Sequence, residues 1–227
     1  TLNCLGMYIP WHKRLLTVED TAELQVYHDH WLRMETRRER PDGTPEVDMN
    51  DCLKSSLRMR PDRIIVGEVR SSEAATLLTA MNTGHDGSFG SLHANTAMET
   101  ITRMINPPMN VPPIMLTGLD LIIIQARLYV NGKTARKITE VAEVAGMEGD
   151  KPRLNAIWKY NAATDQIEET GIPSKMRETI CTAAGITPAQ FEQHVKQREQ
   201  ILADLLNRDI RDIDTVTKVI QGFYATR

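Results

Sequence analysis

Cysteine is scarce in this chain, and its three residues are widely spaced. Cys4, Cys52 and Cys181 form no Cys-x-x-Cys pair anywhere in the 227 residues. The spacing argues against a cysteine zinc site, and the odd number argues against a disulfide framework. We therefore expect a reducing compartment.

The chain also lacks a long apolar run and an excess of charge of either sign. The run nearest to membrane length, Leu119–Gln125, covers about a third of a bilayer span. No signal peptide opens the sequence, which begins at Thr1 and is expected to be a fragment. The formal net charge is -3, so nothing indicates a polyanion binder, and no nucleic acid is expected as a partner.

Short apolar runs that alternate with helical stripes predict an α/β domain with a parallel sheet. Leu15–Val18 has the composition of a strand, and Ile64–Val66 is typical of a strand buried on both faces. An apolar stripe over Ala74–Met81 predicts a helix, and a short strand is expected to run to Leu92. The capping pattern of Thr96–Glu99 predicts the start of another helix.

The pattern changes in the second half of the chain. Asn131-Gly132, between Leu121–Val130 and Lys133–Val144, predicts a β-hairpin with a type I′ turn. After about residue 173 the chain is predicted to be helical, with a helix start at Thr187–Gln190. In the first half, residues 29–52 are polar and broken by proline and glycine, which predicts a loop or lid.

Two carboxylates, Glu19 and Asp20, follow the first predicted strand. Open α/β sheets bind their ligands beyond the carboxyl ends of their strands, so this pair could hold Mg²⁺ or orient a water molecule. The alternative is the start of a helix with one acid as its cap. Spacing alone favours the cap.

A second cluster ends the predicted buried strand with Gly67, Glu68 and Arg70. A strand that delivers a glutamate to its carboxyl end has the geometry of a Walker-B element. That glutamate would polarise the water that attacks a phosphate, because phosphoryl transfer depends on positioning and charge stabilisation. The alternative is an ion pair between Glu68 and Arg70 at a strand end.

Histidines form the third cluster, with His85 in the glycine-rich turn Gly84–Ser88 and His93 two residues before Asn95. The glycines allow tight turns. A histidine at a strand end can donate a hydrogen bond to a γ-phosphate. A lone histidine is more often structural, but His93 and Asn95 follow Glu68 by one predicted strand.

The fourth cluster is basic. Arginines stabilise charge on a phosphoryl group in transfer, particularly across a subunit interface. Acidic residues interleave with them, so a solvated face of mixed charge is the alternative that spacing favours. The arginines are Arg33, Arg37, Arg38 and Arg40.

In order along the chain, these clusters resemble the type II/type IV secretion ATPase superfamily, and within it the tight-adherence (Flp) pilus assembly ATPases. Glu19–Leu24 resembles the Asp box of that family, and Leu57–Arg70 resembles its Walker-B segment. Ala80–Asn95 resembles its His box, and Arg136–Met147 resembles a stretch seen in the tight-adherence branch. The resemblance covers roughly residues 1–147.

The resemblance implies a RecA-like P-loop NTPase core with a parallel sheet, a β-hairpin extension and a helical C-terminal tail. We expect the core over residues 1–150 and a mostly helical appendage over residues 151–227. ATP and Mg²⁺ are the implied cofactors. The implied assembly is a cytoplasmic homo-oligomer, a hexamer, that works at the inner membrane on a platform protein of a pilus or secretion machine.

The resemblance also assigns roles to the residues of the four clusters. The implied catalytic residues are Glu68, Glu19 and His93. The implied nucleotide-binding residues are Arg33 and Arg37, as candidate arginine fingers, with Arg70, His85 and Asn95. The implied metal residue is Asp20, which could hold Mg²⁺ through water. Gly67 stands where many such motors carry Asp, so other acids or water must hold the metal.

The chain departs from the family in one respect. The glycine-rich Walker-A loop should end just before Thr1–Leu5, and no Gly-x₄-Gly-Lys-Ser/Thr motif occurs in the sequence. We expect the chain, taken alone, to be inactive, whether through truncation or because the loop belongs elsewhere. Two alternatives to a secretion or pilus motor are a DNA-translocating RecA-type motor and a non-catalytic scaffold module of a motor.

Overall fold

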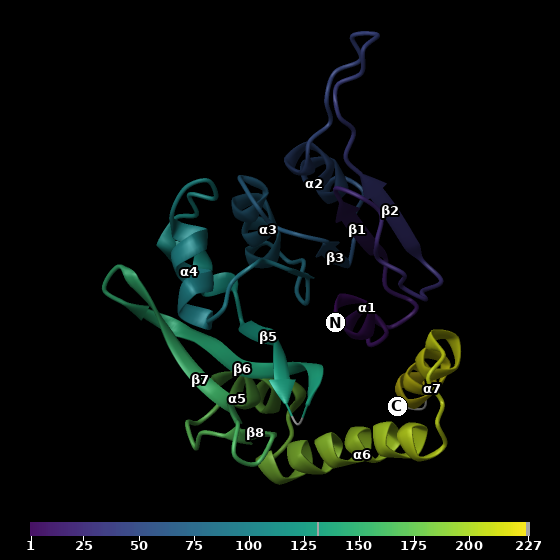
Figure 1. The fold of residues 1–227 in the computed structure, drawn as a ribbon, viewed down its shortest axis with the longest axis vertical. Coiled ribbons are helices and arrows are strands. Elements are labelled where there is room, and N and C mark those ends of the chain that lie inside the picture. The colour runs from purple at the N-terminus through teal and green to yellow at the C-terminus, as the bar shows by residue number, and fades with distance from the viewer. Residues whose placement is uncertain (131, 226–227) are drawn as a thin grey trace. The chain divides into compact units, whose positions relative to one another are not determined.

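The computed structural model describes residues 1–130 and 132–225, which fold into two compact units. The first unit contains Thr1–Val69, Thr83–Ser91 and the described chain from Ile186 onward. The second unit contains Arg70–Asn82 and Leu92–Gly185. Figure 1 labels the helices and strands of both units.

Four parallel strands in the order β2-β1-β3-β4 form the sheet of the first unit. The strands are β1 (Leu15–Glu19), β2 (Trp31–Glu35), β3 (Arg63–Val66) and β4 (Phe89–Gly90). All residues of β1 are buried, because β1 pairs on both sides with other strands. The predictions of a parallel sheet and of strands at Leu15–Val18 and Ile64–Val66 are confirmed.

The helices of the first unit come from residues 2–57 and from residues 188–225. They are α1 (Leu2–Gly6), α2 (Met49–Leu57), α6 (Pro188–Asn207) and α7 (Ile213–Ala225). α2 packs against β1 and β2. The predicted start of α6 is confirmed, because Thr187 and Gln190 form a capping box ahead of Pro188.

An apolar core joins α1 and the segments after it to the sheet. Its buried residues come from β1, from the chain on either side of β1, and from β3. They are Ile9, Leu15, Leu24, Val26 and Ile65, with Leu2, Trp31 and Phe89 packed against them. This core anchors the turn that follows β1.

The prediction of a loop or lid over residues 29–52 is wrong at both ends. β2 begins at Trp31, and α2 begins at Met49 behind a capping box formed by Asp48 and Asp51. β2 was missed because Arg33 and other polar residues lie on it. The irregular segment that remains, residues 36–48, extends away from the sheet in Figure 1.

Four antiparallel strands in the order β5-β6-β7-β8 form the sheet of the second unit. The strands are β5 (Leu121–Val130), β6 (Lys133–Glu148), β7 (Lys151–Asn161) and β8 (Gln166–Glu169). The predicted hairpin is confirmed, since Val130 pairs with Lys133 and Gly132 has a φ of 76°. Asn131, the first residue of the predicted type I′ turn, lies outside the described residues.

β7 and β8 correct the sequence prediction, which placed residues 151–227 in a mostly helical appendage. The predicted domain boundary at residue 150 falls in the turn between two paired strands, β6 and β7. An alternating pattern in β7, with Leu154, Ala156, Trp158 and Tyr160 at every second position, was the missed signal. Pro152 obscured it, although proline is tolerated here because β8 pairs only from Trp158 onward.

Helices complete the second unit. They are α3 (Glu73–Asn82), α4 (Ala97–Ile105), the 3₁₀ helix η1 (Pro113–Gly118) and α5 (Lys175–Ala184). α3 and α4 confirm the helices predicted at Ala74–Met81 and after Thr96, and helical structure from α5 onward confirms the predicted C-terminal helices. The buried carboxylate of Glu143 accepts hydrogen bonds from Ser174 and from the backbone of Lys175 and Met176, which ties α5 to β6.

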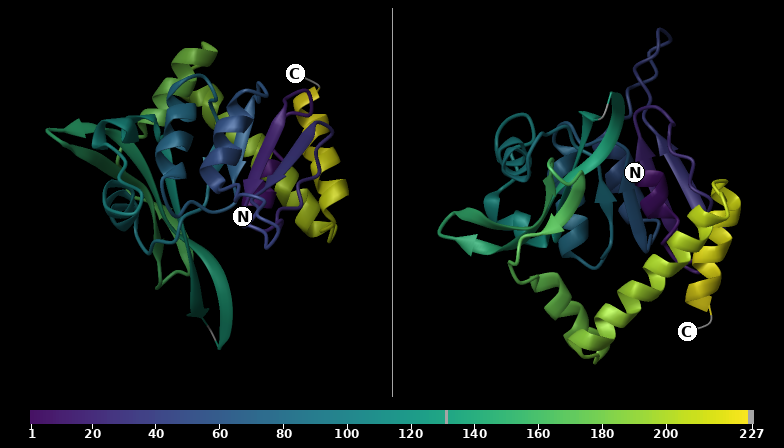
Figure 2. Two further views of the ribbon diagram at one scale, coloured as in Figure 1. Left: turned by 90° about the horizontal axis from the view of Figure 1, so that it is seen from above. Right: turned by 60° about the horizontal axis from the view of Figure 1, so that its bottom comes forward.

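The side chain of Gln221 fixes α7 to the segment between α1 and β1. Its Nε2 donates to the carbonyls of Met7 and Ile9, both at 2.8 Å, and its Oε1 accepts from the Trp11 N–H at 3.3 Å. Gln221 is only 5% exposed, so these backbone groups have little access to water. Figure 2 shows α7, in yellow, beside the purple N-terminal segment.

Gln221→Ala should lower the free energy of unfolding by about 2–4 kcal/mol, because it leaves two carbonyls and one N–H without their partner. Urea or guanidinium unfolding of the chain measures the change. The matched control is Gln200→Ala, at an exposed position of α6, which should change stability by less than about 0.5 kcal/mol. Equal effects of the two substitutions would contradict the role of the Gln221 contacts.

Candidate functional site

The candidate site lies where β1 and β3 end, at the carboxyl edge of the parallel sheet. Glu19 is the last residue of β1, and Gly67 and Glu68 directly follow β3. The Gly67 N–H donates to the Val18 carbonyl at 2.8 Å, so the two strand ends remain side by side. Open parallel sheets bind their ligands at this edge.

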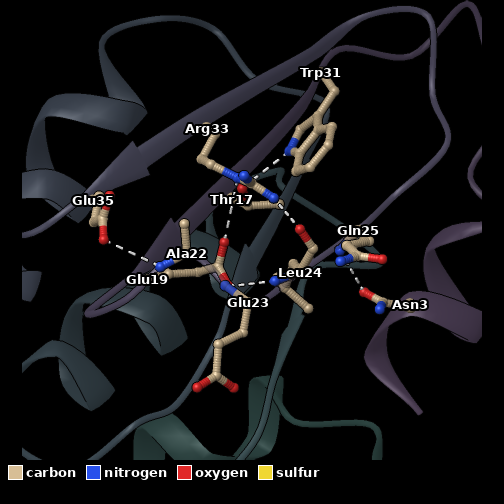
Figure 3. Close-up of polar contacts among 10 residues, drawn as sticks. All are labelled: Asn3, Thr17, Glu19, Ala22, Glu23, Leu24, Gln25, Trp31, Arg33 and Glu35. Atoms are coloured by element: carbon tan, nitrogen blue, oxygen red, sulfur yellow. Dashed lines mark hydrogen bonds and ion pairs between the residues drawn. The ribbon is translucent and has the colours of Figure 1, made fainter.

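The carboxylate of Glu19 organises the turn after β1 (Figure 3). Its Oε1 accepts the N–H groups of Glu23 and Leu24 at 2.9 and 2.7 Å. Among the described residues, its Oε2 accepts no hydrogen bond, although it is buried and lies 3.6 Å from Nε of Arg33. Glu19 itself is 2% exposed. The sequence left open whether Glu19 caps a helix; it caps a turn, and no helix begins there.

A row of alternating residues on β1 and β2 supports this carboxylate. The parallel register pairs Leu15 with Trp31 and Thr17 with Arg33, so these side chains share one face of the sheet. Trp31 Nε1 donates to Thr17 Oγ1 at 3.0 Å. The guanidinium of Arg33 lies 4.5 Å from the centroid of the Trp31 ring and donates to the carbonyl of Leu24.

The rest of the turn is held by contacts from the end of β2. Glu35 Oε1 accepts the Ala22 N–H at 3.2 Å, and Asp20 Oδ1 accepts the Thr36 hydroxyl at 2.6 Å. The Thr36 N–H donates to the Glu19 carbonyl at 3.0 Å. Both predicted acids of the Asp box are therefore fixed by hydrogen bonds within the first unit.

Gly67 gives the Glu19 side chain its room. A Cβ at position 67 would lie 3.0 Å from Glu19 Cγ, which is closer than ordinary van der Waals contact. Many motors that the Walker-B segment resembles carry Asp at the position of Gly67. In this chain a side chain there would displace Glu19.

Glu68 is half-buried, and the backbone around it is pinned by Ser91. Ser91 Oγ donates to the Gly67 carbonyl at 2.5 Å, and the Val69 N–H donates to the Ser91 carbonyl at 2.8 Å. These bonds continue the sheet past the end of β3. They join the backbone on either side of Glu68 to the chain that follows β4.

Asp62, the acid that precedes β3, lies at the opposite edge of the sheet. It accepts the Arg14 N–H at 2.8 Å and contacts Lys13 Nζ at 3.1 Å. The hydrogen bond from Arg14, aided by Lys13, lowers the pKa of Asp62. Asp62 therefore ties the start of β3 to the start of β1 and is not part of the candidate site.

The other predicted residues of the first unit are Arg37 and His85. Arg37 is exposed at the start of the segment 36–48, where its guanidinium donates to the Pro45 carbonyl at 3.1 Å. His85 is half-buried in the turn before β4, and its carbonyl accepts the Ser88 N–H and hydroxyl. Ser88 Oγ in turn accepts the Ile64 N–H at 3.0 Å, which joins the turn to β3.

Arg70, His93 and Asn95 belong to the second unit, and all three are exposed. The N–H and side-chain amide of Asn95 donate to Glu99 at 2.9 and 3.0 Å. Thr96 caps α4 as predicted, because its side chain accepts the Glu99 N–H at 3.0 Å. The Glu99 carboxylate accepts hydrogen bonds from Asn95 and not from the Thr96 backbone, as it would in a full capping box. Asn95 therefore helps to start α4.

Within residues 1–130 and 132–225, no three His, Cys, Asp or Glu side chains gather into a metal-binding group. A closed protein cage for a metal is therefore not formed by the described residues. Mg²⁺ needs less, since it is commonly held by one or two carboxylates together with phosphate and water oxygens. The exposed carboxylate of Asp20, directly after β1, fits that requirement. None of the described helices is both long and apolar enough to cross a membrane.

Sequence reasoning missed the supporting contacts of the site. Trp31, Thr17 and Glu35 have no motif of their own, and their roles follow from the pairing of β1 with β2. The available signal was the alternation of Trp31, Arg33 and Glu35 at every second position. That alternation is typical of one face of a strand.

The comparisons with known proteins agree with this geometry. A family model described as "Type II/IV secretion system protein" matches residues 1–219. The chain belongs to the type II/IV secretion system ATPase family. A probable conjugal transfer protein TrbB of Sinorhizobium fredii is 46% identical over 163 residues, which are 69% of the chain and 44% of that protein.

Two other matches have a lower sequence identity to the chain than TrbB has. An uncharacterised protein of Methanocaldococcus jannaschii is 33% identical over 90% of the chain and 76% of its own length. The crystal structure of the VirB11 ATPase from the Brucella suis type IV secretion system, in complex with sulphate, has a TM-score of 0.50 at 26% identity. That match covers 62% of the chain and 44% of VirB11. It confirms the predicted RecA-like α/β class of the core.

The chain spans about half the length of most of the curated relatives it matches, for example 54% and 41% of two other Methanocaldococcus jannaschii proteins. The matches therefore establish the family to which this part of the sequence belongs.

Gly67→Ala should destabilise the chain by about 1–2 kcal/mol, because the new methyl group displaces Glu19 from its hydrogen bonds. Amide hydrogen exchange at Glu23 and Leu24, together with chemical unfolding, measures the effect. The matched control is Gly222→Ala in α7, where nothing lies within 4 Å of the added Cβ. It should be neutral or stabilise by up to about 1 kcal/mol. Unchanged exchange at Glu23 and Leu24 would show that Gly67 is not needed for the packing of Glu19.

Proposed function

We propose that the intact protein is an ATP-hydrolysing motor of a pilus-assembly or secretion machine. The observation that carries the proposal is the placement of Glu19 and Glu68 at adjacent strand ends, in a chain that matches the family over residues 1–219. Phosphoryl transfer requires carboxylates that position a water molecule and a metal beside the phosphates. The carboxyl edge of a parallel sheet is where such a ligand binds.

The residues of the site divide into roles by their surroundings. Glu68, which is half-buried, polarises the attacking water. Glu19 is held in one orientation by two backbone N–H groups, so it acts as a fixed charge beside Glu68. His93 contacts the γ-phosphate, and the remaining predicted phosphate-binding residues contribute to nucleotide binding. Those residues are Arg70, His85 and Asn95.

ATP and Mg²⁺ are the proposed cofactors. Mg²⁺ neutralises charge on the phosphates when it is bound. Asp20 would hold it at the end of β1, directly or through water, with phosphate oxygens as the other ligands. Asp20 is already oriented by the Thr36 hydroxyl at 2.6 Å. This contact keeps its carboxylate at the carboxyl edge.

The proposed assembly is a homo-oligomer, a hexamer, that works in the cytoplasm on an inner-membrane platform protein. Arg37 is the candidate arginine finger, because its guanidinium is exposed on the segment 36–48. An arginine supplied across a subunit interface ties hydrolysis to assembly. Membership of the tight-adherence pilus branch is part of the proposal and rests on the resemblance of Arg136–Met147.

Calorimetry in the presence of Mg²⁺ should detect no binding of ATP to residues 1–227 alone. Backbone N–H groups and the lysine of a Walker-A loop provide much of the phosphate binding in P-loop enzymes. The chain contains one Gly-Lys-Thr triplet, at residues 132–134, but it starts β6 in an antiparallel hairpin. Micromolar binding would show that the phosphates are held by residues outside such a loop.

In the intact protein, Glu68→Gln should reduce ATP turnover by at least about a hundredfold, because a general base contributes roughly 10²–10⁴-fold to rate. Nucleotide affinity should stay within about threefold, since the carboxylate acts on water. Steady-state hydrolysis and equilibrium binding of a fluorescent ATP analogue measure the two quantities. The control is Glu199→Gln, on an exposed position of α6, which should leave both unchanged. Equal losses of affinity and turnover would assign Glu68 to binding.

A further inference from the structure

We propose that Arg33 is a positioning residue that holds Glu19 and the turn after β1 within its own subunit. The proposal rests on the motor function proposed above and changes the role of one residue in it. The resemblance implied that Arg33, like Arg37, reaches a nucleotide as an arginine finger. The contacts of the two side chains separate them.

The guanidinium of Arg33 is held against the ring of Trp31. Its guanidinium lies 4.5 Å from the Trp31 ring centroid, and the ring is fixed by the hydrogen bond from Nε1 to Thr17 Oγ1. Thr17 has no exposed surface, since it lies on the fully buried β1. The planar guanidinium suits such a stack, whereas a lysine ammonium does not.

The same guanidinium fixes the turn. It donates to the Leu24 carbonyl, while the Leu24 N–H donates to Glu19 Oε1 at 2.7 Å. Leu24 is thus held through its carbonyl by Arg33 and through its N–H by Glu19. Leu24 is also buried in the core at 7% exposure, so the turn is anchored on three sides.

Arg33 also supplies the positive charge opposite the buried oxygen of Glu19. Oε2 accepts no hydrogen bond from the described residues, and Arg33 Nε lies 3.6 Å from it. A buried carboxylate oxygen is stable in its place only with a compensating charge or hydrogen bond. Without Arg33, the Glu19 carboxylate loses this compensation and should move away from its position beside Gly67. The position is close: a Cβ added to Gly67 would lie 3.0 Å from Glu19 Cγ.

These contacts occupy Arg33 in a way that Arg37 does not share. Arg33 contacts a carbonyl of the turn after β1, a carboxylate of β1 and an aromatic ring of β2. Arg37 donates to Pro45 within the exposed segment 36–48 that carries it. A side chain that must reach another subunit cannot keep three contacts within its own subunit. Arg33 therefore acts in cis, whereas Arg37 is available to act in trans.

Mixed rings of the intact protein distinguish the two roles. An Arg33→Ala subunit retains Glu68, and a Glu68→Gln subunit retains Arg33. If Arg33 acted across subunits, the first would borrow the arginine of the second, and activity would return on mixing. We expect no recovery for Arg33→Ala, because its own Glu19 stays misplaced. Recovery above the sum of the separate variants would overturn the proposal.

Kinetics and exchange give a second test. Arg33→Ala should lower kcat about tenfold to a hundredfold with KM for ATP nearly unchanged, as expected when a supporting side chain is lost. Arg33→Lys keeps the charge but loses the contact with the Trp31 ring and the guanidinium donor to Leu24. Its kcat should therefore lie between the kcat of the wild type and that of Arg33→Ala. In the chain itself, Arg33→Ala should speed amide exchange at Glu23 and Leu24 by about tenfold or more. Unchanged exchange at both amides would overturn the proposal.

The matched control is Arg38→Ala, an exposed arginine on the segment 36–48, which should leave exchange at Glu23 and Leu24 unchanged. If the intact wild-type protein hydrolyses no ATP, the motor function fails, and the exchange experiment still decides whether Arg33 holds the turn. If Arg33→Ala does not fold, Arg33→Lys provides the same comparison. Wild-type kcat and wild-type exchange in Arg33→Lys would then contradict the requirement for a guanidinium.

Discussion

The buried carboxylate of Glu19 is the group on which the carboxyl edge of the parallel sheet depends. One oxygen gathers two backbone N–H groups of the following turn, and the other faces Arg33 on β2. Its stem lies against Gly67, at the end of β3. A charge that is removed from water is tolerated only where its surroundings compensate it. The end of β1 is therefore linked to its neighbours on both sides by a single side chain.

This arrangement has the character of a prepared site. Groups that stabilise a reaction are most effective when they need not move at the moment of reaction. Glu19 is fixed by backbone donors, Asp20 by a hydroxyl, and the backbone beside Glu68 by Ser91. The segment 36–48 carries Arg37 and is held mainly by hydrogen bonds within itself, such as those between Arg37 and Val47. The first unit thus combines a rigid edge with an extension on which Arg37 is exposed.

The parts of the fold with strong local signals were predicted from sequence. Ile64–Val66 is a strand because a short, wholly apolar run satisfies a position buried on both faces, and Thr187–Gln190 starts a helix because its cap is local. β2 was not predicted, because an exposed strand face carries polar residues that resemble a loop. The pairing of Arg33 with Glu19 was not predictable either, since it arises from the register of β1 with β2, which no local pattern encodes.

The Gln221 contacts have a consequence for how the chain is made. They join residues 7–11 to residue 221, so the first unit is built from segments that lie before, between and after the two segments of the second unit in the sequence. Contacts of such long sequence separation form late, because a large loop must close first. During synthesis, the antiparallel sheet of the second unit can form while the C-terminal helices are still unmade. The first unit can be completed only after α7 has left the ribosome, so the backbone groups of residues 7–11 lack their Gln221 partner until then.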